Sequence, residues 1–559
     1  MQNIIKQAVT EVLKELGITD VDFVVEHPAD ISHGDYACNV AMAAAKKLGK
    51  NPRELAEVIV EKLEGKIEQA DSFSVAGPGF INVHLNRVFF TSEIGRAVEL
   101  GDDWGKNEQE KGEVVLIEYT SPNLFKPLHV GNLVGNIIGE SLTRLYEFAG
   151  ADVKRMNYPS DIGLPVAKAV WGLKKTGNDP TDITALGEAY RVGNSAYEKD
   201  GVEKEEIIEI NQKLYAGSDS ELSALRTVGI KTSKDRINEL CVMLGTHFDT
   251  EIFESQAAQP GLEIVRAHIG DIFEESEGAV IYSEEKSGLH TRVFLNSKGL
   301  PTYEAKDIGH FTLKSSAYPD WTQSIIVTGS EQTEYFKVVF SALRKLFPEI
   351  ETKPLVHIPT GFLTLSTGKM SSREGNVLTG ESLLEELVVS AHDGAKESRA
   401  DDVDILTQEV AVAALKYQIL RHGVGSNIVF DKAKALSFEG DSGPYLQYTQ
   451  ARILSVLDKA ADAGVAPDTS VAPEIPYTLE KVLYRFPEVV VDARIERAPQ
   501  KMVTYLTELA SMYNSFYAAE KIADADDEYA PYKAVLSQAV AQTLRNGLWV
   551  LGIKAPEKM

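Results

Sequence analysis

The segment from residue 113 to 158 constrains the fold more than any other part of the chain. An apolar run at 114–117 and a second predicted strand at 153–158 flank a helical pattern from about 128 to 148. A strand, a helix and a strand in this order predict a βαβ unit, in which the two strands are parallel. Parallel sheets of this kind bind ligands at the carboxyl ends of their strands. We therefore expect a ligand site in the loop at 121–129.

Glycines recur along the predicted helix of this unit. Gly131, Gly135 and Gly139 are spaced by four residues, which places them on one helical face. A face without side chains can approach a sheet or a ligand closely. We predict close packing rather than a dinucleotide-binding loop, because the full GxGxxG pattern is absent.

The bulk composition favours a soluble, cytoplasmic protein of several domains. A chain of 559 residues is too long for one hydrophobic core, and roughly three or four domains are expected. No apolar run approaches the roughly 18 residues needed to cross a bilayer, and no secretory leader pattern is present. The two cysteines, Cys38 and Cys241, do not support a disulfide framework or a cysteine-based zinc site.

The net charge of −26 argues against a surface that binds nucleic acid without specificity, because such binding needs a basic face. Local basic clusters, such as Lys154 with Arg155 or Lys501 with Arg494 and Arg497, can still form a positive track. An RNA partner would therefore bind in a salt-sensitive, shape-dependent manner.

Two short motifs predict phosphate chemistry. His129-Val130-Gly131-Asn132 opens the predicted helix, and Lys369-Met370-Ser371-Ser372-Arg373 lies in a Gly- and Ser-rich loop after the apolar run at 355–358. An imidazole at a helix start and an ammonium in a loop can both hold a polyphosphate. A buried histidine and an exposed turn lysine are the alternatives for each motif alone. A P-loop is excluded, because Gly361 lies seven residues before Gly368 instead of five.

The residues around the first motif narrow the family. The segment at 118–131 reads EYTSPNLFKPLHVG and resembles the corresponding segment of arginyl-tRNA synthetases, which are class I aminoacyl-tRNA synthetases. Segments 303–308 and 551–559 are also similar to that family, so the resemblance extends from end to end. It implies that ATP and arginine form arginyl-adenylate and pyrophosphate, and that the arginyl group then moves to the 3′-terminal adenosine of tRNA(Arg).

The resemblance assigns residues to the ATP phosphates. It implies catalytic roles for His129, Asn132, Lys126, Lys369, Ser371 and Ser372, and ATP-binding roles for His129, Gly131, Asn132, Lys369 and Met370. Asn132 departs from the family, which usually has a second histidine at this position. An amide donates a hydrogen bond but cannot carry the charge that a protonated histidine brings to a phosphate.

The arginine pocket can be tested on chemistry alone. A guanidinium is planar and permanently charged, so its pocket should supply carboxylates and an aromatic face. The resemblance implies the following arginine-binding residues: Glu118, Ser121, Asn123, Tyr303, Asp307 and Gln332. Asp307 and Tyr303 would hold the side chain, and Glu118 would face the ammonium or brace the pocket. A surface carboxylate or a core tyrosine is the alternative for each residue alone.

The resemblance also implies a domain organisation. It predicts a small α+β domain at 1–110 that binds the tRNA elbow, a Rossmann-type α/β catalytic domain at 111–381, a helical connector at 382–440 and an all-α anticodon-binding domain at 441–559. A helical insertion at about 164–275 interrupts the catalytic sheet, which we expect to resume near Gly278. The predicted tRNA contacts are Phe80, Asn82, Tyr448, Arg452 and Tyr513, with core packing as the alternative for each aromatic ring.

ATP is expected as a substrate with Mg²⁺, without zinc or an organic cofactor, and the chain is expected to act as a monomer. Three rivals remain. A class I synthetase for another amino acid would share both motifs but would have no use for two pocket acids. A small-molecule nucleotidyltransferase of the same fold would not need the helical C-terminal part, and a catalytically inactive RNA-binding relative would not need His129 and Lys369.

Overall fold

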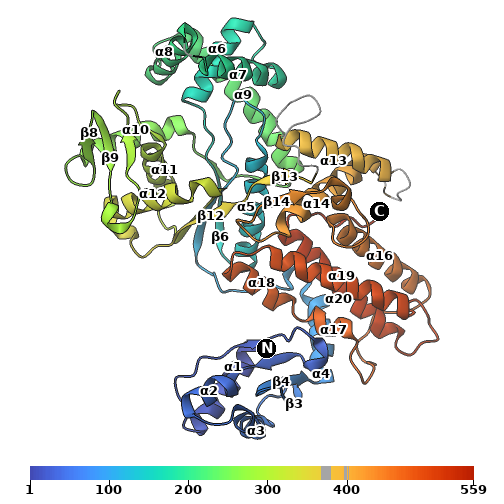
Figure 1. Ribbon diagram of the computed structural model, residues 1–559. Coiled ribbons are helices and arrows are strands. Elements are labelled where there is room, and N and C mark those ends of the chain that lie inside the picture. The colour runs from blue at the N-terminus through green and yellow to red at the C-terminus, as the bar shows by residue number, and fades with distance from the viewer. Residues whose placement is uncertain (200, 367–378, 396–399, 401) are drawn as a thin grey trace. The chain divides into compact units, whose positions relative to one another are not determined.

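The computed structural model describes residues 1–199, 201–366, 379–395, 400 and 402–559. It divides into two compact units, each assembled from distant parts of the chain (Figure 1). The first contains residues 1–105, 449–488 and 506–546, and the second contains residues 106–448, 489–505 and 547–559. No helix in the described part is long and apolar enough to cross a membrane.

A five-stranded parallel sheet forms the centre of the second unit. Its strand order is β12-β11-β5-β6-β7. The strands span Leu355–Thr360 (β12), Gln323–Gly329 (β11), Val114–Glu118 (β5), Asp152–Asn157 (β6) and Thr250–Glu251 (β7). The chain winds from β5 in one direction through β6 and β7, and in the other through β11 and β12. The strand order therefore reverses between β5 and β11, and a crevice is expected at their carboxyl ends.

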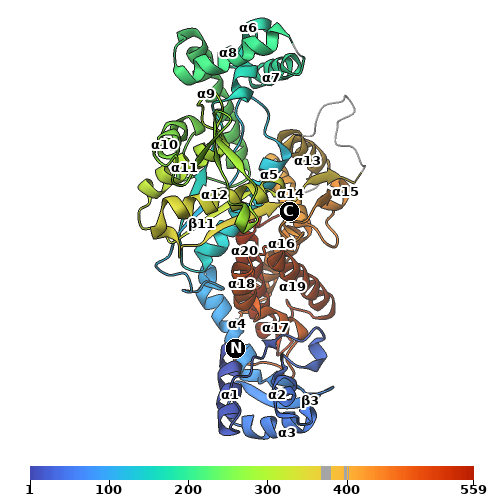
Figure 2. The ribbon, with the colours of Figure 1, turned by 60° about the vertical axis from the view of Figure 1, so that its left-hand side comes forward.

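Helices cover both faces of this sheet because the side chains of β5 alternate between them. Val114 and Leu116 pack with helices α10 (Glu254–Ala267), α11 (Tyr303–Ala317) and α12 (Thr333–Leu346). Helix α5 (Val130–Phe148) contacts β5, β6, β11 and β12 from the other side (Figure 2). The predicted βαβ unit and the Rossmann-type fold are thus confirmed.

The insertion is helical, as predicted, but shorter. It consists of α6 (Leu164–Thr176), α7 (Ile183–Tyr197), α8 (Val202–Ala216) and α9 (Ser220–Met243), which share one apolar core. The sheet resumes at β7, whose Thr250 pairs with Met156 of β6. The prediction that it resumes near Gly278 was wrong. The apolar run there forms β9 (Ala279–Tyr282) of a separate antiparallel sheet with β8 (Glu274–Ser276) and β10 (Arg292–Leu295).

The rest of the second unit follows β13 (Leu363–Leu365) in the sequence. It comprises α13 (Gly380–Ala395), α14 (Val403–Leu420), β14 (Ile428–Phe430), α15 (Lys432–Ala435), the start of α16 (Gly443–Asp462), residues 489–505 and the C-terminal tail. Strand β14 pairs with β13 in parallel, so the region after residue 382 is not entirely helical as expected.

The first unit joins the N-terminal module to C-terminal helices. An antiparallel sheet of order β1-β2-β4-β3 packs on α1 (Gln2–Glu15), α2 (Val40–Leu48), α3 (Pro52–Leu63) and α4 (Arg87–Leu100). Its strands span Val25–Glu26 (β1), Tyr36–Cys38 (β2), Ala70–Ala76 (β3) and Phe80–Leu85 (β4). Tyr36 donates a hydrogen bond to Glu488 at 3.0 Å, and Trp104 donates one to Thr543 at 3.0 Å. The expected independent N-terminal domain therefore shares its compact unit with C-terminal residues.

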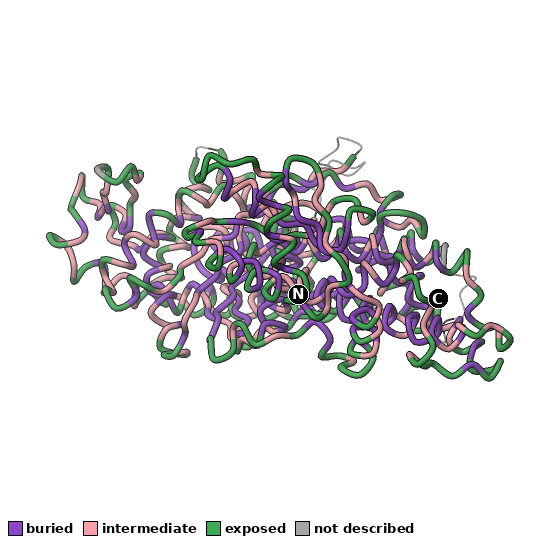
Figure 3. The backbone as a smooth tube through the Cα atoms, turned by 90° about the horizontal axis from the view of Figure 1, so that it is seen from below, coloured by how far each residue is buried: buried purple, intermediate pink, exposed green. Residues whose placement is uncertain are grey.

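Four further helices lie in the C-terminal part of the chain. They are α17 (Thr478–Leu483), α18 (Phe486–Ile495), α19 (Gln500–Ala519) and α20 (Ala530–Val550). Helix α18 begins just before Pro487, because proline lacks the amide hydrogen that a helix interior needs and is tolerated in a first turn. Buried backbone follows the packed faces of the elements, and exposed backbone lies on the outside (Figure 3).

Candidate active site

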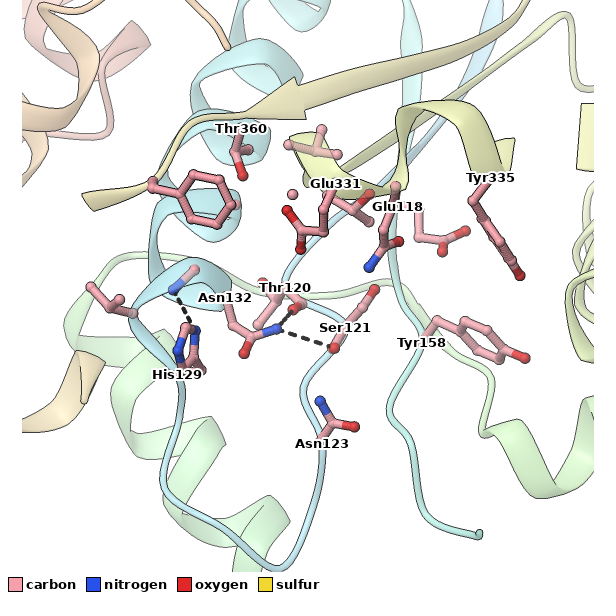
Figure 4. A pocket seen from close by; sticks show the side chains of 18 of the residues that line it. Glu118, Thr120, Ser121, Asn123, His129, Asn132, Tyr158, Glu331, Tyr335 and Thr360 are labelled. Atoms are coloured by element: carbon pink, nitrogen blue, oxygen red, sulfur yellow. Dashed lines mark hydrogen bonds between the residues drawn. The ribbon is translucent and has the colours of Figure 1, made fainter. Parts of the chain in front are cut away.

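A cavity of about 660 Å³ opens at the carboxyl ends of β5, β11 and β12, where the strand order reverses. Its lining includes these predicted site residues: Glu118, Ser121, Asn123, Lys126, His129, Gly131, Asn132, Tyr303, Asp307 and Gln332. All of them belong to the second unit. Figure 4 shows Tyr158 and Tyr335 at one end of the cavity and His129 at the other. The residues expected to hold a guanidinium and those expected to hold phosphates therefore share one space.

His129 is the N-cap of α5. Its Nδ1 accepts a hydrogen bond from the backbone amide of Gly131 at 3.1 Å (Figure 4). Burial and the neighbouring Lys126 lower the pKa of the imidazole, so the ring is neutral near pH 7. A neutral ring whose Nδ1 accepts must carry its proton on Nε2. His129 can therefore donate from Nε2 to a phosphate oxygen beside the positive end of the helix dipole.

Asn132 does not present its amide hydrogens to the cavity. Its Nδ2 donates to the carbonyl oxygens of Thr120 at 2.8 Å and Ser121 at 3.3 Å (Figure 4). An amide nitrogen has two hydrogens, and both are used here. In this conformation Asn132 braces the loop after β5 and has no donor left for a phosphate.

The braced loop has unusual backbone geometry. Thr120, Ser121 and Phe125 have φ values of 73°, 40° and 67°. Residues other than glycine rarely adopt these positive backbone angles. Each such residue costs of order 1–3 kcal/mol and persists only where its surroundings hold it. Asn136 donates to the Thr120 hydroxyl at 3.0 Å, and the amide of Phe125 donates to Ser233 at 2.9 Å. Helices α5 and α9 together therefore fix this loop.

Four carboxylates line the cavity, and the surroundings of Glu118, Glu254, Asp307 and Glu331 differ. Glu118 lies 3.3 Å from the Nζ of Lys314, and Glu254 lies 2.7 Å from the Nζ of Lys306. Asp307 accepts a hydrogen bond from the hydroxyl of Tyr335 at 2.5 Å. Among the described residues, no nitrogen of a basic side chain lies within 4.0 Å of the Asp307 carboxylate. Asp307 is thus the part-buried cavity acid without a resident counter-ion among the described residues, whereas Glu331, for which no ion pair is found either, is exposed to solvent.

The ionisation of Asp307 reflects this isolation. Burial raises the pKa of its carboxyl to about 7, and the nearby charges of Glu118 and Glu254 act in the same direction. The hydrogen bond from Tyr335 and the more distant charge of Lys314 oppose this rise only in part. The carboxyl is therefore about half ionised near neutral pH. A bound cation would favour its ionised form.

The remaining arginine-pocket candidates surround these acids. The ring of Tyr303 is 53% exposed, and the Nζ of Lys306 lies 4.4 Å from its centroid. The Ser121 hydroxyl oxygen is buried without a hydrogen-bond partner, which leaves it free to bind a substrate group. Asn123 forms an isolated bridge with Ser160, so its backbone position is fixed.

Several cavity residues were not predicted. Tyr158, Glu254, Arg292, Thr328, Glu331 and Tyr335 also line the cavity. Tyr335 lies on α12, where its spacing resembles that of ordinary core residues, and Glu254 is the first residue of α10. No local signal distinguishes them. Only the pairing of Tyr335 with Asp307 and of Glu254 with Lys306 identifies their roles.

The second predicted motif lies outside the described residues. Lys369, Met370, Ser371 and Ser372 fall within 367–378. The described residues on either side of this segment meet the site. Leu365 lines the cavity, and Thr379 forms an isolated bridge with His129.

The predicted tRNA contacts differ in exposure. Phe80 is partly exposed and Tyr448 is 39% exposed, whereas Asn82 is 5% exposed and Tyr513 is fully buried. Tyr513 packs among the C-terminal helices with its hydroxyl 3.4 Å from Ser537, so we assign it to the core. We likewise assign Asn82 to the sheet interior. Arg452 donates to Asn514 at 2.6 Å. Within the described part, no three His, Cys, Asp or Glu side chains are placed to share a metal ion.

Three family models together match most of the chain. Residues 96–432 match the catalytic domain of "tRNA synthetases class I (R)", residues 1–85 match the "Arginyl tRNA synthetase N terminal domain", and residues 446–559 match the "DALR anticodon binding domain". A protein of Fusobacterium nucleatum named "Arginine--tRNA ligase" is 31% identical over 549 residues, which cover 94% of this chain and 93% of that protein.

Solved structures agree with these matches. The arginyl-tRNA synthetase of Thermus thermophilus is 26% identical, with a TM-score of 0.80 and complete coverage of both chains. The arginyl-tRNA synthetase of Plasmodium falciparum has a TM-score of 0.81 at 20% identity, covers 100% of this chain and 99% of that one, and supports the fold alone.

Proposed function

Because the chain belongs to the arginyl-tRNA synthetase family, we propose specific roles for its cavity residues in arginine activation and transfer. The protein is an arginine–tRNA ligase. It joins arginine to ATP as arginyl-adenylate, releases pyrophosphate, and transfers the arginyl group to the 3′-terminal adenosine of tRNA(Arg). The fold and the function implied by the sequence motifs are both confirmed.

Asp307 is the proposed acceptor for the substrate guanidinium, and its lack of a resident cation is the observation that carries this assignment. Glu118 and Glu254 already have lysine partners, whereas Asp307 gains one only when arginine binds. Tyr303 supplies an aromatic face, and Tyr335 orients the carboxylate. Ser121 and Asn123 bind the amino-acid backbone groups, and Gln332 lies at the rim.

His129 is the proposed phosphate ligand at the other end of the cavity, with Lys126 as a second cation. Adenylate formation requires that the carboxylate of arginine reach the α-phosphorus while negative charge spreads over the phosphates. A neutral imidazole donates to these oxygens, and Lys126 neutralises charge. ATP arrives as its magnesium complex. Lys369 remains the proposed partner of the leaving pyrophosphate, Met370 a proposed ATP-binding residue, and Ser371 and Ser372 proposed catalytic residues.

The predicted domain roles also remain proposals. The family matches at 1–85 and 446–559 support tRNA-elbow and anticodon contacts by the two ends of the chain. Activity as a monomer likewise remains a proposal. We place the reaction in the cytoplasm, where tRNA is charged for translation.

Arginine-dependent exchange of pyrophosphate into ATP tests the assignment. The assay is run with each of the twenty amino acids, with and without tRNA. We expect exchange with arginine only, and in most of this family tRNA must be present before activation occurs. Exchange driven by another amino acid, or none with arginine at any tRNA concentration, would contradict the assignment of the pocket.

The affinity for arginine should depend on pH through Asp307. The ionised carboxylate binds the guanidinium, and its pKa in the empty site is about 7. Protonation below that value competes with arginine, so the dissociation constant should be about tenfold larger at pH 6 than at pH 8. Calorimetry in two buffers of different ionisation enthalpy measures this change together with proton release on binding. An affinity that is constant across this range would show that Asp307 does not titrate in the binding step.

Substitution of Asn132 distinguishes a brace from a phosphate ligand. In Asn132→Asp a carboxylate would face two carbonyl oxygens, so kcat/KM for arginine should fall about 100-fold. In Asn132→Ala both hydrogen bonds are lost without repulsion, and kcat/KM for arginine should fall about tenfold. Asn132→His should not gain rate, because one imidazole cannot reproduce both bonds. The KM values for arginine and ATP are measured separately. A phosphate role instead predicts a rise in the KM for ATP with unchanged arginine binding.

A further inference from the structure

The insertion brings a second lysine beside the cavity. Helix α7 packs on the loop before His129, where a Cβ at Gly187 would lie 3.3 Å from the ring of Pro127. Helix α6 packs on α7 so closely that a Cβ at Gly193 would overlap the backbone oxygen of Lys168. These contacts place Lys168 near Lys126, the residue that precedes Pro127.

Both lysines are held by neutral groups. The Nζ of Lys126 lies 5.5 Å from the centroid of Tyr190, and the Nζ of Lys168 lies 4.2 Å from the centroid of Tyr197. Lys168 also donates to the side-chain oxygen of Asn194 at 2.9 Å. In the part of the chain that the structure describes, no carboxylate oxygen lies within 4.0 Å of either ammonium. Two half-buried like charges therefore lack a close counter-ion.

The electrostatics of this pair favour an anion. Burial lowers the pKa of Lys126, and the charge of Lys168 lowers it further. Burial also lowers the pKa of Lys168, against a weaker opposing effect of Glu198. The net charge of the whole chain is −26, so a cationic pair at the cavity edge is a local exception. An anion that contacts both lysines would relieve their repulsion and replace the solvent that they have lost.

The position of the pair indicates which anion binds. Lys126 lines the cavity, but Lys168 does not. Arginine and ATP occupy the cavity, so a ligand that touches both lysines must pass through its edge. Only the RNA strand, among the three substrates, extends from the reacting atoms to the outside. We propose that Lys168, joined by Lys126 once pyrophosphate has left, holds a phosphodiester of the single-stranded 3′ end of the tRNA whose terminal adenosine enters the cavity.

This proposal rests on the proposed function, and it assigns a role to the insertion. Lys168 acts as a positioning residue, since it fixes the strand outside the cavity and does not touch the reacting atoms. The positive charge of Lys168 is required for this role, whereas the geometry of its hydrogen-bond donors matters less. An arginine should therefore replace it in part and a glutamine should not.

Charging kinetics of Lys168→Gln test this role. We expect kcat/KM for tRNA to fall roughly tenfold, the KM values for ATP and arginine to stay within about twofold, and Lys168→Arg to recover most of the loss. The matched control is Lys174→Gln on the same helix, whose lysine pairs with Glu221 at 3.1 Å and should change none of these values. A rise in the KM for ATP would assign the pair to the nucleotide and overturn the proposal, as would unchanged kcat/KM for tRNA.

Binding of shortened tRNA locates the contact. The dissociation constants of intact tRNA and of tRNA lacking its last two nucleotides are measured with wild type and Lys168→Gln over a range of salt concentrations. We expect the substitution to weaken intact tRNA roughly tenfold and to reduce its salt slope by about 0.7, without affecting the shortened tRNA. Equal weakening of both tRNAs would place Lys168 elsewhere on the RNA. Because binding requires no turnover, this result stands even if the wild-type protein failed to charge arginine.

Discussion

Asp307→Asn should lower kcat/KM for arginine by about a thousandfold, which corresponds to roughly 4 kcal/mol. The substitution keeps the shape of the side chain but removes the part-buried cavity carboxylate that has no resident cation among the described residues. A desolvated guanidinium would then face a neutral amide. The NH₂ group of that amide would point its hydrogens at the N–H groups of the guanidinium, and no hydrogen bond can form between two donors. Glu118 and Glu254 cannot compensate, because Lys314 and Lys306 already occupy them.

Substrate preference gives a second measure of the same variant. Citrulline has a neutral side chain of nearly the same shape as arginine, so wild type should reject it and Asp307→Asn should lose most of that discrimination. Steady-state charging and direct binding by calorimetry measure both ligands. Asp320→Asn makes the same chemical change at an exposed position shortly after α11 and should leave both values unchanged. If the dissociation constant of Asp307→Asn for arginine stayed within about threefold of the wild-type value, the guanidinium would have to bind elsewhere.

Gly139→Ala should destabilise the second unit by about 3 kcal/mol or more. A Cβ at this position would lie 2.3–2.8 Å from the Cβ, Cγ and Cδ1 atoms of Tyr119, which are too close to the backbone to swing away. The hydroxyl of Tyr119 is also held by Glu140 at 2.7 Å, so the ring cannot leave without breaking a buried hydrogen bond. The sheet and α5 must therefore separate, although alanine favours a helix over glycine.

Thermal and denaturant unfolding measure this effect, and Gly95→Ala is the matched control. Gly95 also lies inside a helix, but a Cβ there meets no atom within 4 Å. We expect that control to be neutral or more stable by about 0.5–1 kcal/mol, since alanine loses less backbone entropy. The loop at 120–121 follows Tyr119, so Gly139→Ala should also weaken arginine binding. A melting temperature equal to that of wild type would refute the close packing.

Site residues could be predicted from the sequence where they lie close together along the chain. The 118–132 segment contains the end of β5, the loop and the start of α5, so its cavity residues follow each other in the chain. Tyr303 and Asp307 lie one helical turn apart and point to one side for the same reason. The four-residue spacing of glycines likewise predicted a bare helix face, which Gly139 confirms against Tyr119.

Local periodicity identified elements but not their partners. The apolar run near Gly278 is a strand, as its composition indicates, yet it pairs in a separate antiparallel sheet while the short β7 completes the central one. A strand of two residues has too little pattern to be recognised. Pro487 is a local signal for the break between α17 and α18. The apolar spacing on both sides of this proline resembles that of one continuous helix and hides the break.

The sequence by itself determined the strand–helix–strand core, the position of the ligand loop and the residue types that suit ATP and a guanidinium, because these depend on order and spacing along the chain. Only the tertiary structure decided that Lys314 and Lys306 neutralise Glu118 and Glu254 while Asp307 stays without a cation, and that Asn132 braces the loop after β5. Which charge remains available depends on distances between residues far apart in the chain, and those distances exist only once the chain has folded.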